Sequence, residues 1–65
     1  MITLNGEETI VKKGMSLLSW LNSNGIEQVM VAVEYNGEIL NRSDFGKIML
    51  KDGDKLEIVK FMGGG

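Results

Sequence analysis

The stretch "VMVAVEYNGEIL", residues 29–40, decides the fold class, because it has the pattern of two strands joined by a two-residue turn. Asn36-Gly37 separates two β-like runs, and Asn-Gly is the strongest short-range signal for a β-hairpin. A two-residue turn pairs Tyr35 with Glu38, which fixes the faces of both strands. The apolar residues then expected together on one face are Val31, Val33 and Leu40.

A second Asn-Gly pair, Asn5-Gly6, joins "ITL" to "EETIV" near the start of the chain. A two-residue loop here pairs Leu4 with Glu7 and turns Ile10 away from the core. A bulged three-residue loop would bring Ile10 into the core instead. The sequence leaves both registers open.

Between the two hairpins, the segment "GMSLLSWLNSNG", residues 14–25, predicts a short helix. Ser16 is the expected N-cap, because its hydroxyl can accept a hydrogen bond from the first turn. Leu17, Trp20 and Leu21 follow the spacing of one helix face. We therefore expect a single helix that packs its apolar stripe against a sheet.

The segment after the second hairpin is less regular. In residues 41–50 we expect Ser43 to cap a single turn that carries Phe45, and residues 48–50 to form a short edge segment. "KDGD", residues 51–54, has the composition of a turn and lacks the oxygen-ligand density of a calcium loop.

The last strand is predicted in "KLEIVKF", residues 55–61. Two hairpins, one helix and a final strand predict a two-layer α+β domain, with one main helix packed on one face of the strands. If Leu56 faces the helix, Val59 and Phe61 lie on the opposite face. They represent either ordinary surface apolarity or part of a docking patch for a partner.

The composition excludes several classes of function. The 65 residues, expected as one domain over 1–61, include no histidine and no cysteine, which removes the common general base and thiolate ligands. The net charge of −2 argues against nucleic-acid binding. No apolar run approaches the roughly 20 residues that span a bilayer, and no signal peptide is apparent. We expect a cytoplasmic protein with no catalytic residue and no metal site.

The remaining chemical feature is the glycine run of residues 63–65, within an expected flexible tail of residues 62–65. A carboxylate on Gly65 becomes electrophilic only when a partner enzyme activates it. Glycine has no Cβ, so such a tail can thread a narrow channel in any backbone conformation. A frayed end or a cloning scar are the alternatives. We predict that Gly63 and Gly64 lie in the partner's channel.

The order and spacing of these motifs resemble the ThiS family, the sulfur carriers of thiamine biosynthesis. The resemblance covers the whole chain and rests on "LNGEE", "VAVEYNGEILNRSDF" and "LKDGDKLEIVKFMGGG". Asn41 stands where these proteins often have proline. The resemblance implies a β-grasp, ubiquitin-like fold with a mixed sheet of four to five strands, and a docking step that involves Val59, Phe61 and Met62.

The resemblance also implies a carrier that acts as a co-substrate and not as an enzyme. A ThiF-type adenylyltransferase would use ATP to activate the Gly65 carboxylate, and a sulfur donor such as a cysteine desulfurase would convert it to a thiocarboxylate. A ThiG-type thiazole synthase would accept the sulfur. A MoaD-type carrier for molybdopterin synthesis, a ubiquitin-like protein modifier and an inert binding module remain as alternatives.

Overall fold

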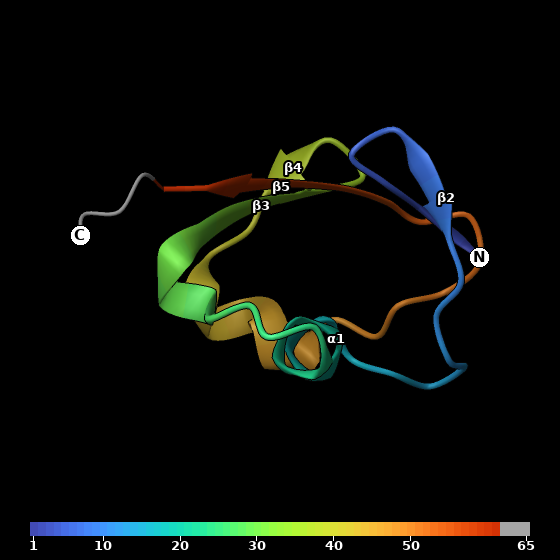
Figure 1. The fold of residues 1–65 in the computed structure, drawn as a ribbon, viewed down its shortest axis with the longest axis horizontal. Coiled ribbons are helices and arrows are strands. Elements are labelled where there is room, and N and C mark those ends of the chain that lie inside the picture. The colour runs from blue at the N-terminus through green and yellow to red at the C-terminus, as the bar shows by residue number, and fades with distance from the viewer. Residues whose placement is uncertain (62–65) are drawn as a thin grey trace.

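A computed structural model describes residues 1–61, and within them the chain forms one mixed sheet with a helical layer on one side (Figure 1). The strands are β1 (Ile2–Leu4), β2 (Glu7–Thr9), β3 (Val31–Tyr35), β4 (Glu38–Ile39) and β5 (Lys55–Lys60). The helical elements are α1 (Leu17–Ser23) and two 3₁₀ helices, η1 (Gln28–Met30) and η2 (Arg42–Lys47).

The sheet has the strand order β2-β1-β5-β3-β4. β1 and β5 run parallel at its centre, while the other neighbours are antiparallel. The last strand is thus inserted between the two hairpins, and α1 crosses one face of the sheet (Figure 1). This confirms the predicted α+β class with five strands and one main helix.

Both hairpins have two-residue turns, as predicted for the second hairpin and as one of the two registers left open for the first. Asn36 and Gly37 have φ angles of 50° and 91°, a left-handed conformation that glycine adopts without steric cost. The predicted pair Tyr35–Glu38 is formed. In the first hairpin Leu4 pairs with Glu7, and Ile10 is 81% exposed, so the bulged register is excluded.

Helix α1 begins as its sequence predicts. The Ser16 hydroxyl accepts a hydrogen bond from the backbone N of Ser19 at 3.0 Å, which satisfies one of the free N–H groups of the first turn. Leu17, Trp20 and Leu21 form the buried stripe of the helix. This stripe lies against the sheet, whose inward side chains complete the core. The nine buried apolar residues are Ile2, Leu17, Trp20, Leu21, Val31, Val33, Phe45, Leu50 and Leu56.

The prediction for residues 41–50 was wrong in detail. The helical turn begins at Arg42 and has Asn41 at its N-cap position, so Ser43 lies inside η2 and caps nothing. Residues 48–50 form no strand of the sheet, and Met49 makes only an isolated bridge to Ser16. The position of η2 is set by one large side chain and not by the turn residues around it. Phe45 is 1% exposed and anchors η2 in the core.

Candidate functional site

Strand β5 is the element that leads to the predicted functional tail. It lies between β1 and β3, and its pairing extends to Phe61, whose backbone N donates to Met30 O at 2.8 Å. The chain is therefore held on the sheet as far as Phe61. Met62, Gly63, Gly64 and Gly65 lie outside the described residues, so their predicted roles remain predictions.

The asparagines of both turns hold β5 through their side chains. Asn5 Oδ1 accepts from Ile58 N at 2.7 Å, and Asn5 Nδ2 donates to Ile58 O at 3.3 Å. Asn36 Oδ1 accepts from Lys55 N at 2.8 Å, while its backbone N donates to Lys55 O at 2.8 Å. The parallel β1–β5 ladder ends just before Ile58, so the Asn5 amide takes the place of the next backbone partner.

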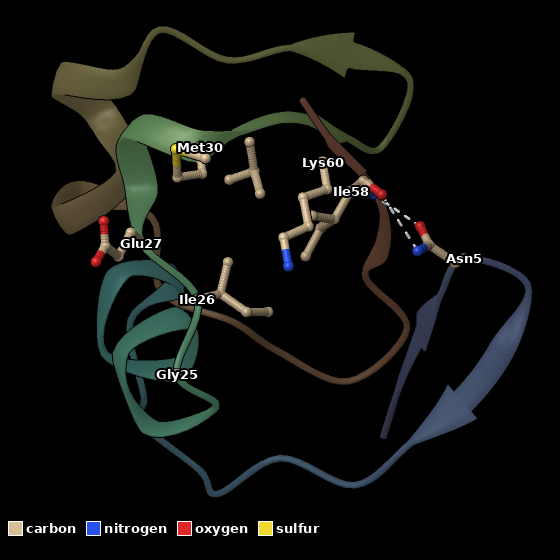
Figure 2. Close-up of a pocket in the computed structure, with 8 residues that line it drawn as sticks. Asn5, Gly25, Ile26, Glu27, Met30, Ile58 and Lys60 are labelled. Carbon is tan, nitrogen blue, oxygen red and sulfur yellow. Dashed lines mark hydrogen bonds between the residues drawn. The ribbon is translucent and has the colours of Figure 1, made fainter. Parts of the chain in front are cut away.

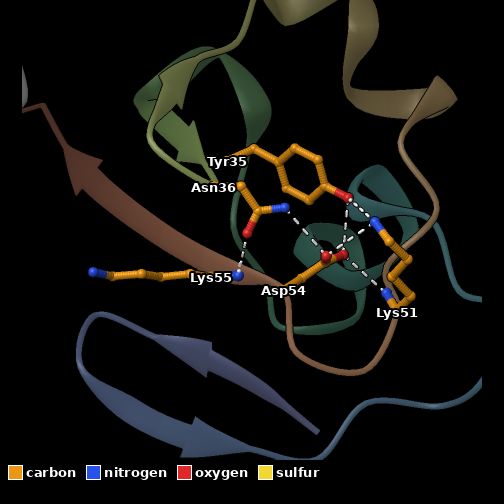
Figure 3. A network of polar contacts seen from close by, with 5 residues as sticks. All are labelled: Tyr35, Asn36, Lys51, Asp54 and Lys55. Carbon is orange, nitrogen blue, oxygen red and sulfur yellow. Dashed lines mark hydrogen bonds and ion pairs between the residues drawn. The ribbon is translucent and has the colours of Figure 1, made fainter.

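A buried carboxylate fixes the start of β5 (Figure 3). Asp54 is 2% exposed and accepts hydrogen bonds from Tyr35 OH (2.9 Å), Asn36 Nδ2 (3.2 Å), Lys51 N (2.9 Å) and Lys51 Nζ (3.1 Å). The network joins the 51–54 turn to the second hairpin. Among residues 1–61 no buried side-chain nitrogen or oxygen lacks a partner.

The pKa values of Asp54 and Lys51 are both shifted by this network, in directions that favour their charged forms. Burial alone would raise the pKa of Asp54, but the hydrogen bonds from Lys51, Asn36 and Tyr35 outweigh it and lower that pKa below its ordinary value. The pKa of Lys51 is raised, first because Tyr35 OH accepts a hydrogen bond from its ammonium and then because Asp54 does. Asp54 is therefore ionised and paired at neutral pH.

The helix-free face of the sheet exposes apolar side chains near the end of β5. Val59 is 61% exposed and Phe61 48% exposed, which confirms the predicted face. Two further residues that the sequence did not single out share this face. Ala32 pairs directly with Val59, and Ile39 on the edge strand β4 is 78% exposed. We call Ala32, Ile39, Val59 and Phe61 the apolar patch.

A shallow depression of about 170 Å³ lies within this face. Glu34 and Glu57 border it, and they are direct cross-strand partners in the β3–β5 ladder. The residues that line it are Ala32, Val33, Glu34, Ile39, Glu57 and Val59.

A larger open pocket of about 530 Å³ lies on the other side of β5, against the connection from α1 to β3 (Figure 2). Lys60 and Ile26 point into it, Glu27 points its carboxylate away, and Asn5 closes one end through its bonds to Ile58. Lys60 faces no carboxylate here that could act with it as an acid–base pair. The pocket therefore has the shape of a binding recess and lacks the side chains of an active centre.

Residues 1–61 contain no group of three histidine, cysteine, aspartate or glutamate side chains placed to hold a metal ion. None of the helices described is long and apolar enough to cross a membrane. The described residues present the helix-free face of the sheet and the end of the central strand β5.

The family model described as the ThiS family matches residues 2–65. The sulfur carrier protein ThiS of Bacillus subtilis is 38% identical over 66 residues, and the match covers all of both chains. A crystal structure of the thiamine biosynthesis protein ThiS from Geobacter metallireducens superposes with a TM-score of 0.81 at 37% identity, covering 98% of this chain and 97% of that one.

A longer relative is the thiazole synthase of Paramagnetospirillum magneticum, which is 42% identical over 64 residues. The match covers 98% of this chain, which spans only 20% of that synthase.

The five-stranded mixed sheet with one main helix matches the Geobacter structure, and this shared architecture is the β-grasp fold. From the full-length family match and this structural likeness, the chain belongs to the ThiS family.

Proposed function

We propose that this chain is a sulfur carrier of thiamine biosynthesis and that the carboxylate of Gly65 carries the sulfur. The observation that supports this most strongly is the family match, which extends over residues 2–65 and includes the glycine run. The Bacillus relative, described as a sulfur carrier protein, aligns along its whole length. Gly64 and Gly65 take the positions of the diglycine expected in this family.

The geometry is consistent with a protein that presents a reactive group made elsewhere. Residues 1–61 contain no histidine, cysteine or metal-ligand cluster, so activation of the carboxylate must come from a partner enzyme. β5 is anchored on both sides in the sheet, and two asparagine side chains and Asp54 fix its register. The domain thus supplies a rigid support from which the tail extends into a partner.

The proposed chemistry has two steps. In a ThiF-type adenylyltransferase, a Gly65 carboxylate oxygen attacks the α-phosphate of ATP and pyrophosphate leaves, giving an acyl-adenylate. In the second step, a persulfide on a donor such as a cysteine desulfurase attacks the acyl carbon and AMP leaves, giving an acyl disulfide. A thiol reductant then cleaves the S–S bond and releases the thiocarboxylate. ATP is a substrate of the enzyme, so no cofactor is assigned to the carrier itself.

The proposed acceptor of the sulfur is a ThiG-type thiazole synthase. Support comes from the two thiazole synthases that the chain matches at 42% and 38% identity, each over about a fifth of the synthase. A carrier-like segment and a synthase joined in one polypeptide suggest that the two parts act together. We infer that the separate carrier uses the apolar patch to dock on its partners in turn, first on the adenylyltransferase and then on such a synthase, to which its tail delivers sulfur.

The direct test is a change in mass. After incubation with ATP, the adenylyltransferase and a sulfur source, intact-mass spectrometry is expected to show one oxygen of the chain replaced by sulfur. Reactions without ATP serve as the control and should leave the mass unchanged. An unmodified mass with a competent enzyme would contradict the proposal, and an isopeptide adduct on a protein lysine would favour the ubiquitin-like modifier.

Phe61→Ala tests the proposed docking face. Phe61 is about half exposed and is not one of the nine buried core residues, so we expect the thermal midpoint to change by only a few degrees. Binding to the adenylyltransferase, measured by calorimetry, should weaken by about tenfold because a large aromatic contact is lost. Ile10→Ala provides the matched control, since Ile10 is also exposed but lies outside the apolar patch. A large loss of thermal stability in Phe61→Ala with unchanged binding would assign Phe61 to the core.

A further inference from the structure

The helix-free face carries two carboxylates in an arrangement that is unfavourable for the isolated domain. Glu34 and Glu57 are directly opposite each other in the β3–β5 ladder, and both are exposed. Direct cross-strand partners have Cβ atoms about 4.5–5.5 Å apart, and like charges in such pairs are destabilising. Within residues 1–61 neither carboxylate forms an ion pair. Lys55, two residues before Glu57 and on the same face, is the nearest cation along the strand.

The two carboxylates also border the depression of about 170 Å³. Ala32, Ile39 and Val59 also line it, so an apolar surface lies directly beside the two negative charges. This combination matches a long cationic side chain, which buries its methylene groups on apolar surface and keeps its charge at the rim. A guanidinium fits best, because its planar fork of donors can bond two carboxylates at once.

We infer that the depression bordered by Glu34 and Glu57 receives an arginine side chain of the adenylyltransferase when that enzyme docks on the apolar patch. The inference rests on the proposed carrier function, and it names the chemistry by which the docking face selects its partner. The repulsion between the carboxylates in the free domain is offset in the complex, because the single positive charge of the guanidinium attracts both of them. The acidic pair also steers a basic partner surface toward the end of β5.

The test compares the double variant E34Q/E57Q with the control E7Q/E38Q. Glu7 and Glu38 are exposed carboxylates that pair with Leu4 and Tyr35, residues of the sheet's other face. Each variant removes two of the nine acidic residues and changes the net charge from −2 to 0. The pair of variants therefore separates local complementarity from overall charge.

We expect E34Q/E57Q to bind the adenylyltransferase about tenfold more weakly than the wild type at low salt, because charge-assisted hydrogen bonds are lost. The difference should shrink as salt is raised. The E7Q/E38Q control should bind within about twofold of the wild type, as expected for rim charges outside the contact. The thermal midpoint of E34Q/E57Q should stay unchanged or rise, because the repulsion between the two strands is removed.

The inference is overturned if E34Q/E57Q binds like the wild type, if the control loses as much affinity, or if E34Q/E57Q loses thermal stability. Failure of the proposed function is a different result: the wild-type chain would not gain sulfur. If the wild-type chain gains sulfur and E34Q/E57Q binds the adenylyltransferase as well as the wild type does, only the arginine site is contradicted and the carrier function stands.

Discussion

The Asp54→Ala protein is expected to lose about 2–4 kcal/mol of unfolding free energy, because removal of a buried charged partner leaves its donors unsatisfied. Lys51 N and Tyr35 OH both donate to Asp54 Oδ2, and Asn36 Nδ2 donates to Oδ1. At about 0.05–0.15 kcal/mol per residue, a domain of this size has only about 3–10 kcal/mol in total. Urea denaturation at pH 7 should therefore show a much lower midpoint, and the thermal midpoint should fall by about 10–25 °C.

Asp52→Ala is the matched control, because it removes the same side chain from the same turn. Its side chain is 90% exposed and its partner is the amino group of Met1, which is half exposed. Exposed ion pairs of this kind contribute about 0–1 kcal/mol. Equal loss of unfolding free energy in the two variants would show that the turn itself contributes the stability and that the buried hydrogen bonds of Asp54 do not.

The same carboxylate predicts how stability depends on pH. Because the pKa of Asp54 is lowered in the folded protein, the folded state binds fewer protons than the unfolded state in acid. Its contribution is fully present above the unfolded value of about 3.9 and is lost as the pH falls from there through the lower folded pKa. Asp54→Asn should lack this component, so its unfolding free energy should fall less steeply between about pH 5 and pH 2.

Local patterns in the sequence predict most of the fold. The hairpins follow from two Asn-Gly pairs, whose left-handed backbone suits a two-residue turn, and the helix follows from Ser16 and three apolar residues at helical spacing. These signals work because each depends on residues close together in the chain. The register of the first hairpin needed the structure, since both positions of Ile10 satisfy local rules and only packing against the core decides between them.

The long-range roles of polar residues could not be predicted from spacing. Asp52 and Asp54 look alike in the sequence, but Asp54 is buried because Tyr35 and Asn36 approach it from the second hairpin, 19 and 18 residues away. The side chain of Asn5 meets Ile58 only after β5 is inserted beside β1. A signal was nevertheless present: an Asn-Gly turn needs only a left-handed backbone, and asparagine adds an amide that can bond to a neighbouring strand.

The apolar patch was predicted only in part, again for a topological reason. Val59 and Phe61 were expected on the helix-free face because strand alternation places them there. Ile39 and Ala32 joined them only through pairing of β3 with its two neighbours, which brings three strands together on one face. The Glu34–Glu57 pair depends on the same register, and the two residues are far apart in the chain.

Deletion of Gly65 is expected to abolish sulfur loading completely while leaving the fold intact. The proposed chemistry takes place at the carboxylate of residue 65, and removal of one residue draws that group back by about 3.3–3.6 Å in an extended chain. A displacement of this size removes the carboxylate from the reach of an activated phosphate in a rigid active site, where even a 1 Å misplacement can cost about 100-fold in rate. Stability should be retained because all nine buried apolar residues lie between Ile2 and Leu56.

The measurement is intact-mass spectrometry of wild type and deletion variant mixed in one reaction, where the two chains differ in mass and the wild type reports that the enzyme is active. Extension of the chain by one alanine after Gly65 is the matched counterpart, because it moves the carboxylate outward by the same distance. We expect sulfur only on the wild type, and equal thermal midpoints for all three chains. Sulfur on the deletion variant would place the chemistry on another group, and unfolding of that variant would make the glycines structural. Loss of loading in both altered chains with the fold preserved would mean that the position of the carboxylate, set by β5 and the length of the tail, is what the activating enzyme recognises.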